Sequence, residues 1–288
     1  MSDEDKLDSS LSLLRRLDPR VIESNLTNIC TLLGSDDSVV EELLSSVDVP
    51  LKIQTCKQSG KDYLCCDYNR DADSYRSPWS NKYYPEIEDN DEELPPPYPS
   101  SILRQLEIKA NDSFDIYRDL YYEGSGVSSV YLWDTSENED SGLDDGFAGV
   151  VLFKKETSDS LGKWDSNHVF EVIPESEHRI LYKLTTSVIL DLNSNEMNLS
   201  LSGNLIRQLE TSQLVELNNG INLETQHLIN LGQLIEKSEY NIRNLLQDVY
   251  FDKLKDIMLK DLRSIGDIKE KKYEDSKQSE LIKGLNSV

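Results

Sequence analysis

Apolar residues recur every three to four positions at the start of the chain, in "KLDSSLSLLRRL", "VIESNLTNICTLL" and "SVVEELLSSV". This spacing predicts amphipathic helices, because three to four residues make one helical turn. Pro19 separates the first two segments, since proline interrupts a helix. We therefore expect a stalk of short antiparallel helices over residues 1–48.

The pattern changes over residues 49–98, which are rich in Tyr, Asp, Ser and Pro. Short strand-like pieces such as "LKIQ" and "DYLCCDY" precede an acidic, proline-rich run, "EIEDNDEELPPPYP". That composition is typical of an extended surface loop. We expect an irregular globular module here and then a helix within residues 99–126, capped by Ser100 or Ser101.

Five strand-like segments follow over residues 127–210, separated mostly by short loops, and they favour an antiparallel meander. Alternation at Met197, Leu199, Leu201 and Leu205 places the last strand within "EMNLSLSGNLIRQL". One face of the sheet should be buried under a helix.

That helix is predicted over residues 222–265, where an apolar stripe continues for about forty residues. Residues 266–288 form a charged arm that ends in the amphipathic "SELIKGLNSV". The sequence therefore predicts an α+β fold: N-terminal antiparallel helices, an irregular module, and an antiparallel β-meander covered by a long C-terminal helix.

The net charge of −24 over 288 residues excludes favourable contact with nucleic acid. The charge is uneven, because the segment from Arg243 onward carries ten Lys and Arg against nine Asp and Glu. We expect no membrane-embedded segment, because no apolar run is long enough to span a bilayer. Four cysteines without a C-x-x-C pair indicate reduced thiols in the cytoplasm.

Acidic side chains alternate in "CDYNRDAD", as they do at the start of a calcium loop. Asp67, Asn69 and Asp71 fit positions 1, 3 and 5 of an EF-hand. Position 6 is Ala72, which resists the left-handed turn that glycine normally supplies there. Position 12 is Pro78, which has no side-chain oxygen. A polar, tyrosine-rich turn is therefore favoured over a metal site.

No arrangement of residues indicates catalysis. The three histidines, His168, His178 and His227, are scattered over predicted strands and a helix start, where core or surface roles are expected. "PPPY" at residues 95–98 fits the short proline motif that WW domains bind, although such motifs also arise by chance in linkers. The terminal amphipathic segment could pack on its own domain or enter a groove on a partner.

The segment "CDYNRD", continuing through "DSYRSPWSNKYY", resembles the signature of the beta subunit family of F-actin capping protein. Further likeness lies in "LLRRLDPRVIESNL", "FDIYRDLYYEGSGVSSVYLWD", "GFAGVVLFKK", "YKLTTSVIL" and "IRNLLQDVYFDKLKDIM". The signature residues are Cys66, Asp67, Tyr68, Asn69, Arg70 and Asp71. Ala72 stands where the family usually has glycine, two acidic loops are longer, and the C-terminal arm is the least similar part.

The resemblance implies an obligate heterodimer with a similarly folded alpha subunit, in which the two sheets join. Such a dimer binds the barbed ends of actin filaments independently of calcium and blocks subunit addition and loss without severing. It needs no cofactor and is not an enzyme. The alternative is a calcium-regulated cytosolic adaptor that uses Asp67–Asp73.

The resemblance also implies that the arm over residues 266–288 contacts actin. We expect Leu281, Ile282 and Leu285 to fill an apolar cleft, with Lys277 and Lys283 facing acidic residues of actin. Phosphoinositides and proteins with capping-protein-interaction motifs are further expected partners, and the expected location is cortical actin in the cytoplasm. Lipid contact in this chain would involve the lysines at 269, 271 and 272.

Overall fold

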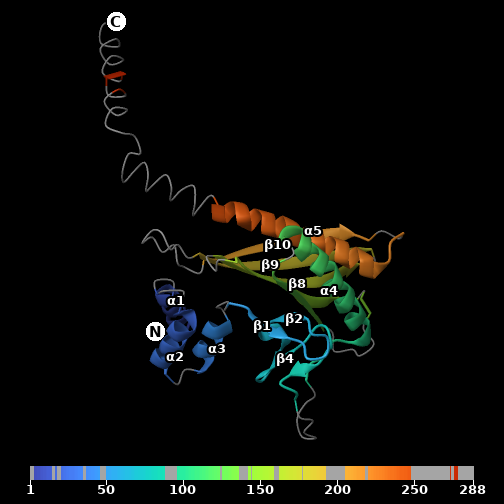
Figure 1. Cartoon of the computed structure of the whole chain (residues 1–288), viewed down its shortest axis with the longest axis horizontal. Coiled ribbons are helices and arrows are strands. Elements are labelled where there is room, and N and C mark those ends of the chain that lie inside the picture. Colours follow the sequence, from blue (N-terminus) through green and yellow to red (C-terminus); the bar gives the residue numbers. More distant parts are fainter. Residues whose placement is uncertain are drawn as a thin grey trace. The chain divides into compact units, whose positions relative to one another are not determined.

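A computed structural model describes the chain at residues 3–14, 17, 21–34, 37–45, 50–87, 96–123, 125–135, 142–143, 145–158, 162–176, 178–192, 205–217, 220–247, 273 and 276–277 (Figure 1). The chain divides into two compact units, Met1–Ser238 and Glu239–Val288. The first unit contains nearly all the described elements. None of the described helices is both long and apolar enough to cross a membrane.

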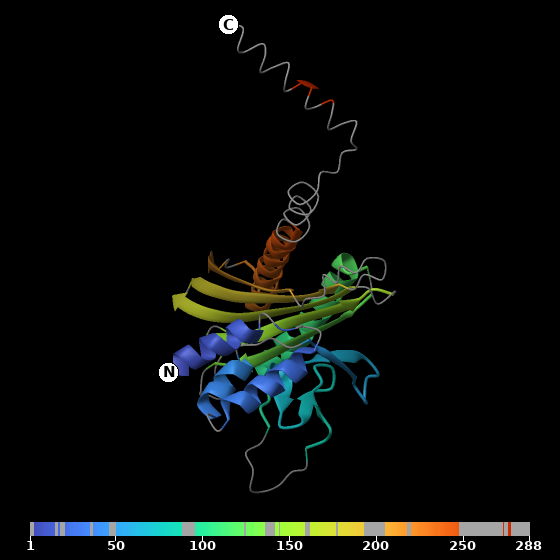
Figure 2. The same cartoon turned by 90° about the vertical axis from the view of Figure 1, so that its left-hand side faces the viewer.

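Three short helices open the first unit: α1 (Asp3–Leu14), α2 (Ile22–Leu33) and α3 (Asp37–Ser45). Figure 2 shows them lying side by side. Their apolar faces meet around the buried side chains of Leu26, Ile29 and Leu43. The expected antiparallel helical segment is therefore present, built on the periodic leucines of the sequence.

An antiparallel sheet of five strands in the order β10-β9-β8-β7-β6 forms the centre of the unit. Each strand pairs with its neighbour in sequence, so the sheet is the predicted meander. The strands are β6 (Val127–Asp134), β7 (Phe147–Glu156), β8 (Gly162–Ser176), β9 (Arg179–Leu192) and β10 (Leu205–Glu216).

The last strand extends further than the alternation predicted. β10 runs through "LIRQLETSQLVE" and pairs along its whole length with β9, down to Glu216 opposite Arg179. Met197, Leu199 and Leu201, on which the prediction depended, lie outside the described residues. The extension follows from the partner, because β9 offers backbone groups beyond the point where the alternation of β10 weakens.

One face of the sheet is covered by two helices, α4 (Ser101–Tyr121) and α5 (Leu223–Leu246) (Figure 1). The buried residues of α4 follow helical spacing, as do Leu231, Leu234 and Ile235 of α5, and both sets pack on inward-facing strand residues. The Ser100 side chain caps α4 by accepting a hydrogen bond from the Leu103 N–H at 3.4 Å. The predicted cap is thus confirmed, and the helix ends at Tyr121, inside the expected range of 99–126.

The opposite face of the sheet carries the module that the sequence predicted to be irregular. It contains a hairpin, β1 (Lys52–Thr55) with β2 (Asp62–Cys65), and a small sheet of β3 (Arg70–Asp71), β4 (Ser74–Arg76) and β5 (Tyr83–Tyr84). Leu51 and Leu64 pack there against Tyr131, Val150 and Leu152 of the sheet.

Polar bonds fix the module on this face of the sheet. The Leu64 N–H donates to Ser129 Oγ at 2.9 Å, and the Tyr131 hydroxyl donates to the Leu64 carbonyl at 2.7 Å. The Leu51 N–H donates to Asp165 Oδ2 at 2.9 Å. Because these bonds are buried, breaking any of them would leave a desolvated polar group.

Candidate functional site

The signature stretch folds as one turn of 3-10 helix, η2 (Asp67–Asn69), followed by the β3–β4 hairpin. Asn69 is the buried residue of the turn, with 2 % of its surface exposed. Its Oδ1 accepts the Cys66 N–H at 2.8 Å, and its amide donates to the carbonyls of Arg76 (2.9 Å) and Leu64 (3.3 Å). One side chain therefore satisfies three backbone groups, which requires an amide with both a donor and an acceptor.

The hairpin after the signature corrects one expectation. Ala72 adopts a left-handed conformation with φ of 47°, although the sequence argument held that alanine resists it. Asp71 pairs with Ser74, so the loop has two residues, and such loops use turns with positive φ. The Arg70 Nε donates to the Ala72 carbonyl at 2.7 Å and helps to hold this turn.

Of the two acidic side chains of the signature, Asp67 lies on the outside of the turn and Asp71 is half-buried. Asp67 has 80 % of its side chain exposed, and one of its oxygens is 3.8 Å from Arg70 Nη1. Asn69, the middle position of the alternating set, instead points inward to the backbone. Within the described ranges, no group of three or more His, Cys, Asp or Glu is placed to hold a metal ion.

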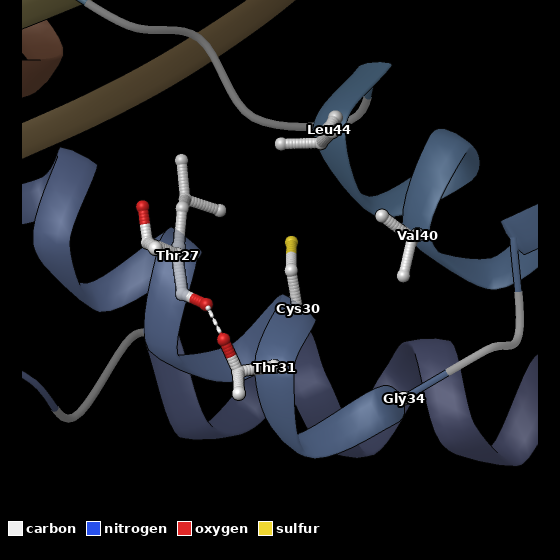
Figure 3. Close-up of a pocket in the computed structure, with 7 residues that line it drawn as sticks. Thr27, Cys30, Thr31, Gly34, Val40 and Leu44 are labelled. Carbon is white, nitrogen blue, oxygen red and sulfur yellow. Dashed lines mark hydrogen bonds between the residues drawn. The ribbon is translucent and has the colours of Figure 1, made fainter.

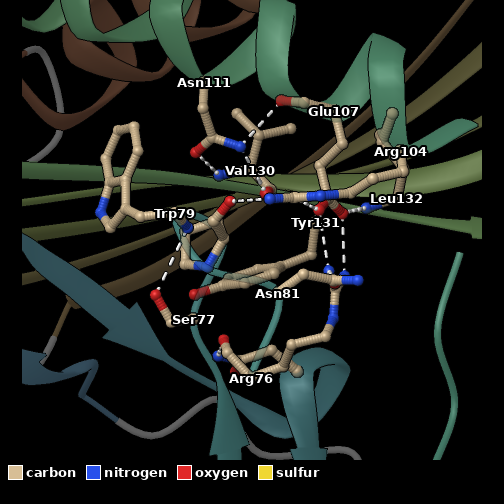
Figure 4. Close-up of polar contacts among 12 residues, drawn as sticks. Arg76, Ser77, Trp79, Asn81, Arg104, Glu107, Asn111, Val130, Tyr131 and Leu132 are labelled. Carbon is tan, nitrogen blue, oxygen red and sulfur yellow. Dashed lines mark hydrogen bonds and ion pairs between the residues drawn. The ribbon is translucent and has the colours of Figure 1, made fainter. Parts of the chain in front are cut away.

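Behind the signature lies a buried ion cluster that connects the module, α4 and β6 (Figure 4). The Arg76 guanidinium forms two parallel bonds of 2.8 Å with the Glu107 carboxylate, and both side chains are almost fully buried. Arg104 contacts the same carboxylate and donates to the Pro78 carbonyl at 2.7 Å. Such bidentate, charge-assisted bonds are the strong ones in proteins.

The electrostatics of this cluster depend on the carboxylate. Burial by itself would lower the pKa of the Arg76 guanidinium, but the hydrogen bonds and charge of Glu107 outweigh it and raise that pKa. The surplus positive charge of the two arginines is shared with neutral acceptors, among them Asn81 Oδ1 at 2.7 Å from Arg76 Nη1. The cluster is therefore a fixed connection between elements.

The same helix satisfies the outer edge of β6. Glu107 Oε2 accepts the Leu132 N–H at 2.8 Å. One turn later, Asn111 Oδ1 accepts the Val130 N–H at 2.9 Å, and its amide donates to the Val130 carbonyl at 3.0 Å. Two side chains spaced four apart on α4 thus match two residues spaced two apart on the strand.

Sequence reasoning missed Arg76, Glu107 and Asn111. A signal was present, because Glu107 and Asn111 fall in register with the apolar residues Leu106, Ala110 and Phe114 of α4. A charged residue at a buried helical position needs a partner, but nothing local in the sequence names Arg76, which lies 31 positions away.

A pocket of about 570 Å³ opens between α2 and α3 (Figure 3). It is lined by Leu26, Thr27, Cys30, Thr31, Gly34, Val40 and Leu44. The Thr31 hydroxyl is already bonded to the Thr27 carbonyl at 2.7 Å. The lining is mainly apolar and carries no charged side chain, and its one thiol is that of Cys30, a free cysteine.

The other predicted residues can be located only in part. Lys277 is described, and its Nζ lies 4.7 Å from the centre of the Tyr273 ring. Leu281, Ile282, Lys283 and Leu285 lie outside the described residues. Of the histidines, His168 bonds to Thr186 and His227 to Tyr182, both at 2.9 Å inside the core, while His178 is exposed.

Comparison with known proteins assigns the family. The family profile "F-actin capping protein, beta subunit" matches residues 7–258. The chain is 64% identical over 293 residues to a protein of Debaryomyces hansenii named F-actin-capping protein subunit beta, covering 99% of each chain. A Saccharomyces cerevisiae protein of the same name is 48% identical over the full length of both chains. This chain therefore belongs to the beta subunit family of F-actin capping protein.

One solved structure gives a more distant match. It is described as a homodimeric actin capping protein alpha subunit from Plasmodium berghei. It shares 17% sequence identity with this chain at a TM-score of 0.47, covering 88% of this chain and 96% of that chain.

Proposed function

We propose that this chain is one half of a heterodimer that binds the barbed ends of actin filaments and blocks subunit addition and loss. The observation that carries the proposal is family membership over nearly the whole length, at 64% identity to a named capping subunit. The protein acts by binding, without severing and without chemistry of its own. It works in the cytoplasm, at cortical actin.

The partner in the proposal is a capping protein alpha subunit. The β10 edge supports a partner, because within the described part of the chain β10 has a single strand neighbour, β9. An open edge of twelve residues presents unpaired backbone groups that another chain can use. We expect the chain expressed alone to be poorly soluble and to become monodisperse when an alpha subunit is coexpressed.

The proposed actin contacts lie in the C-terminal arm, at Lys277, Leu281, Ile282, Lys283 and Leu285. The near-neutral charge of the segment from Arg243 onward supports this choice, because the rest of the chain is strongly acidic. Burying a leucine or isoleucine is worth about 1.5–3 kcal/mol before ordering costs. The arm would therefore add to contacts made by the rest of the dimer.

Seeded actin elongation with the purified heterodimer tests the proposal. The wild-type complex should stop growth at barbed ends at substoichiometric concentration, with and without calcium. Replacing Leu281, Ile282 and Leu285 together by alanine should weaken capping by about tenfold or more. The matched control is Ile116→Ala, which truncates an exposed apolar side chain of α4. If the triple variant capped as well as wild type, the arm would not be part of the actin-binding site.

Calcium independence has its own measurement. Titration calorimetry of the heterodimer with calcium should give no micromolar binding, because Asn69 is committed to backbone groups. Micromolar binding that Asp67→Asn and Asp71→Asn abolish would instead support a calcium-regulated adaptor. The proposed partners also include phosphoinositides, bound through Lys269, Lys271 and Lys272. Proteins that carry capping-protein-interaction motifs complete the set.

A further inference from the structure

The segment between β5 and α4 carries a short proline motif that the proposed actin contacts do not include. Three consecutive prolines and a tyrosine, "PPPY", occupy residues 95–98, and Leu94 separates them from a stretch with six acidic residues within 86–93. Proline fixes its own φ and biases the residue before it toward extended backbone. A run of this kind favours the polyproline II conformation, which has no internal backbone hydrogen bonds.

The last two residues of the motif are exposed. Pro97 and Tyr98 belong to no helix or strand, and Tyr98 has 48 % of its surface exposed, while Pro96 is half-buried and Pro95 lies outside the described residues. A large aromatic residue that remains half-exposed beside an ordered core is the kind of anchor that dominates protein recognition.

The body of the protein holds the motif in place. The Tyr83 hydroxyl donates to the Pro97 carbonyl at 2.8 Å, and the rings of Tyr83 and Tyr98 meet edge to face at 5.5 Å. Burial raises the pKa of Tyr83 to about 12, so its hydroxyl keeps its proton at neutral pH. Two residues after the motif, the Ser100 N–H donates to Asp134 Oδ2 at 2.8 Å. Holding the segment reduces the ordering cost of binding.

We propose that Pro95–Tyr98 is a docking site for a WW domain, a module that reads short proline motifs in an aromatic-lined groove. Polyproline II has three residues per turn, so Pro95 and Tyr98 would share one side of the bound segment. Pro97, whose carbonyl is bonded to Tyr83, is the residue that a partner needs least. The acidic residues of 86–93 favour a WW domain whose groove has a basic rim.

The direct test titrates the intact heterodimer with a purified WW domain of the class that binds Pro-Pro-x-Tyr peptides, followed by calorimetry. Tyr98→Ala and Pro95→Ala should each weaken binding by about thirtyfold or more, because each removes a side chain from the side of the segment that faces the groove. Pro97→Ala is the matched control and should bind within about threefold of wild type. Raising the salt concentration should weaken binding, since the acidic flank contributes.

Several results would overturn the proposal. A synthetic peptide of residues 92–100 that binds while the heterodimer does not would mean that the folded chain withholds the motif. Equal binding by Tyr98→Ala would exclude tyrosine recognition. Loss of binding in Pro99→Ala together with Pro96→Ala, but not in Tyr98→Ala, would indicate a PxxP reader such as an SH3 domain instead. Actin elongation with each variant should match wild type, which separates this site from capping.

Discussion

The two edges of the five-stranded sheet are treated differently by the chain. At the β6 edge, Glu107 and Asn111 of α4 bond to the backbone of Leu132 and Val130. At the β10 edge, the described part of the chain supplies no further strand. An edge that is closed internally cannot recruit another strand, whereas an open one can. The difference favours partner binding at β10 and a structural role for the signature region near β6.

The largest expected loss of stability comes from removing the charge of Glu107, whose carboxylate bonds to the β6 edge. Glu107→Gln removes the charge that compensates Arg76 and Arg104 inside the protein. Leaving a buried charge without its partner costs about 3–5 kcal/mol. Chemical denaturation of the heterodimer should show this loss of unfolding free energy.

The control for that variant is Glu171→Gln. Glu171 pairs with Lys183 on the sheet surface at 3.7 Å, with both side chains about half exposed. An exposed pair contributes at most about 1 kcal/mol. If both variants lose the same small amount, the cluster around Glu107 does not hold the β6 edge.

One pH effect should arise in the other half of the sheet, from a buried histidine. His227 of α5 is buried against Tyr182 of β9, and burial of the charged imidazolium lowers its pKa from 6.5 to about 4. Between these values the unfolded chain binds the proton and the folded chain does not. Stability should therefore fall as pH drops from 6.5 to 4, by up to about 3 kcal/mol.

Comparing variants isolates this contribution from the many carboxylates that titrate in the same range. His227→Gln should flatten the pH dependence, while the exposed His178→Gln should leave it unchanged. Hydrogen exchange near pH 4.5 should show faster opening of β9 than of β6. Uniform loss of protection across the sheet would contradict the distinction between its two halves.

A smaller loss of stability is expected from changing Asn111, the uncharged side chain that bonds to the β6 edge. Asn111→Leu keeps similar side-chain volume but leaves the N–H and carbonyl of Val130 without partners. The expected cost is about 2 kcal/mol of unfolding free energy. Asp112→Ala, on the exposed side of the same helix, is the control and should change stability by less than about 0.5 kcal/mol. If Asn111→Leu lost as little stability as Asp112→Ala, water would be taking the place of the Asn111 side chain.

Periodicity was enough to predict the helices, the meander and the covering helix as far as it is described, from Leu223 to Leu246, because each of these follows from local spacing. It ended β10 too early, at Leu209, because pairing with β9 outweighs the weak alternation after that residue. It could not find the Arg76–Glu107 pair, because a long-range contact leaves no local pattern. The actin contacts were assigned by resemblance alone, and four of those five residues lie outside the described part of the chain.

The smallest expected change in stability comes from Ala72, in the turn between β3 and β4 where a calcium loop would need glycine. Ala72 holds a positive φ that costs an L-residue about 1–2 kcal/mol, and Ala72→Gly removes that cost. Glycine also makes the unfolded chain more flexible, which offsets about 0.4–1 kcal/mol of the gain. The net result should be a stabilisation of about 0.5 kcal/mol, visible as a higher denaturation midpoint. Ala110→Gly, inside α4, should instead lower it by about 1 kcal/mol or more, because glycine is unfavourable within a helix. If Ala72→Gly were destabilising, the hairpin would form its turn without a left-handed residue. The argument that alanine at position 72 disfavours a calcium loop would then hold again.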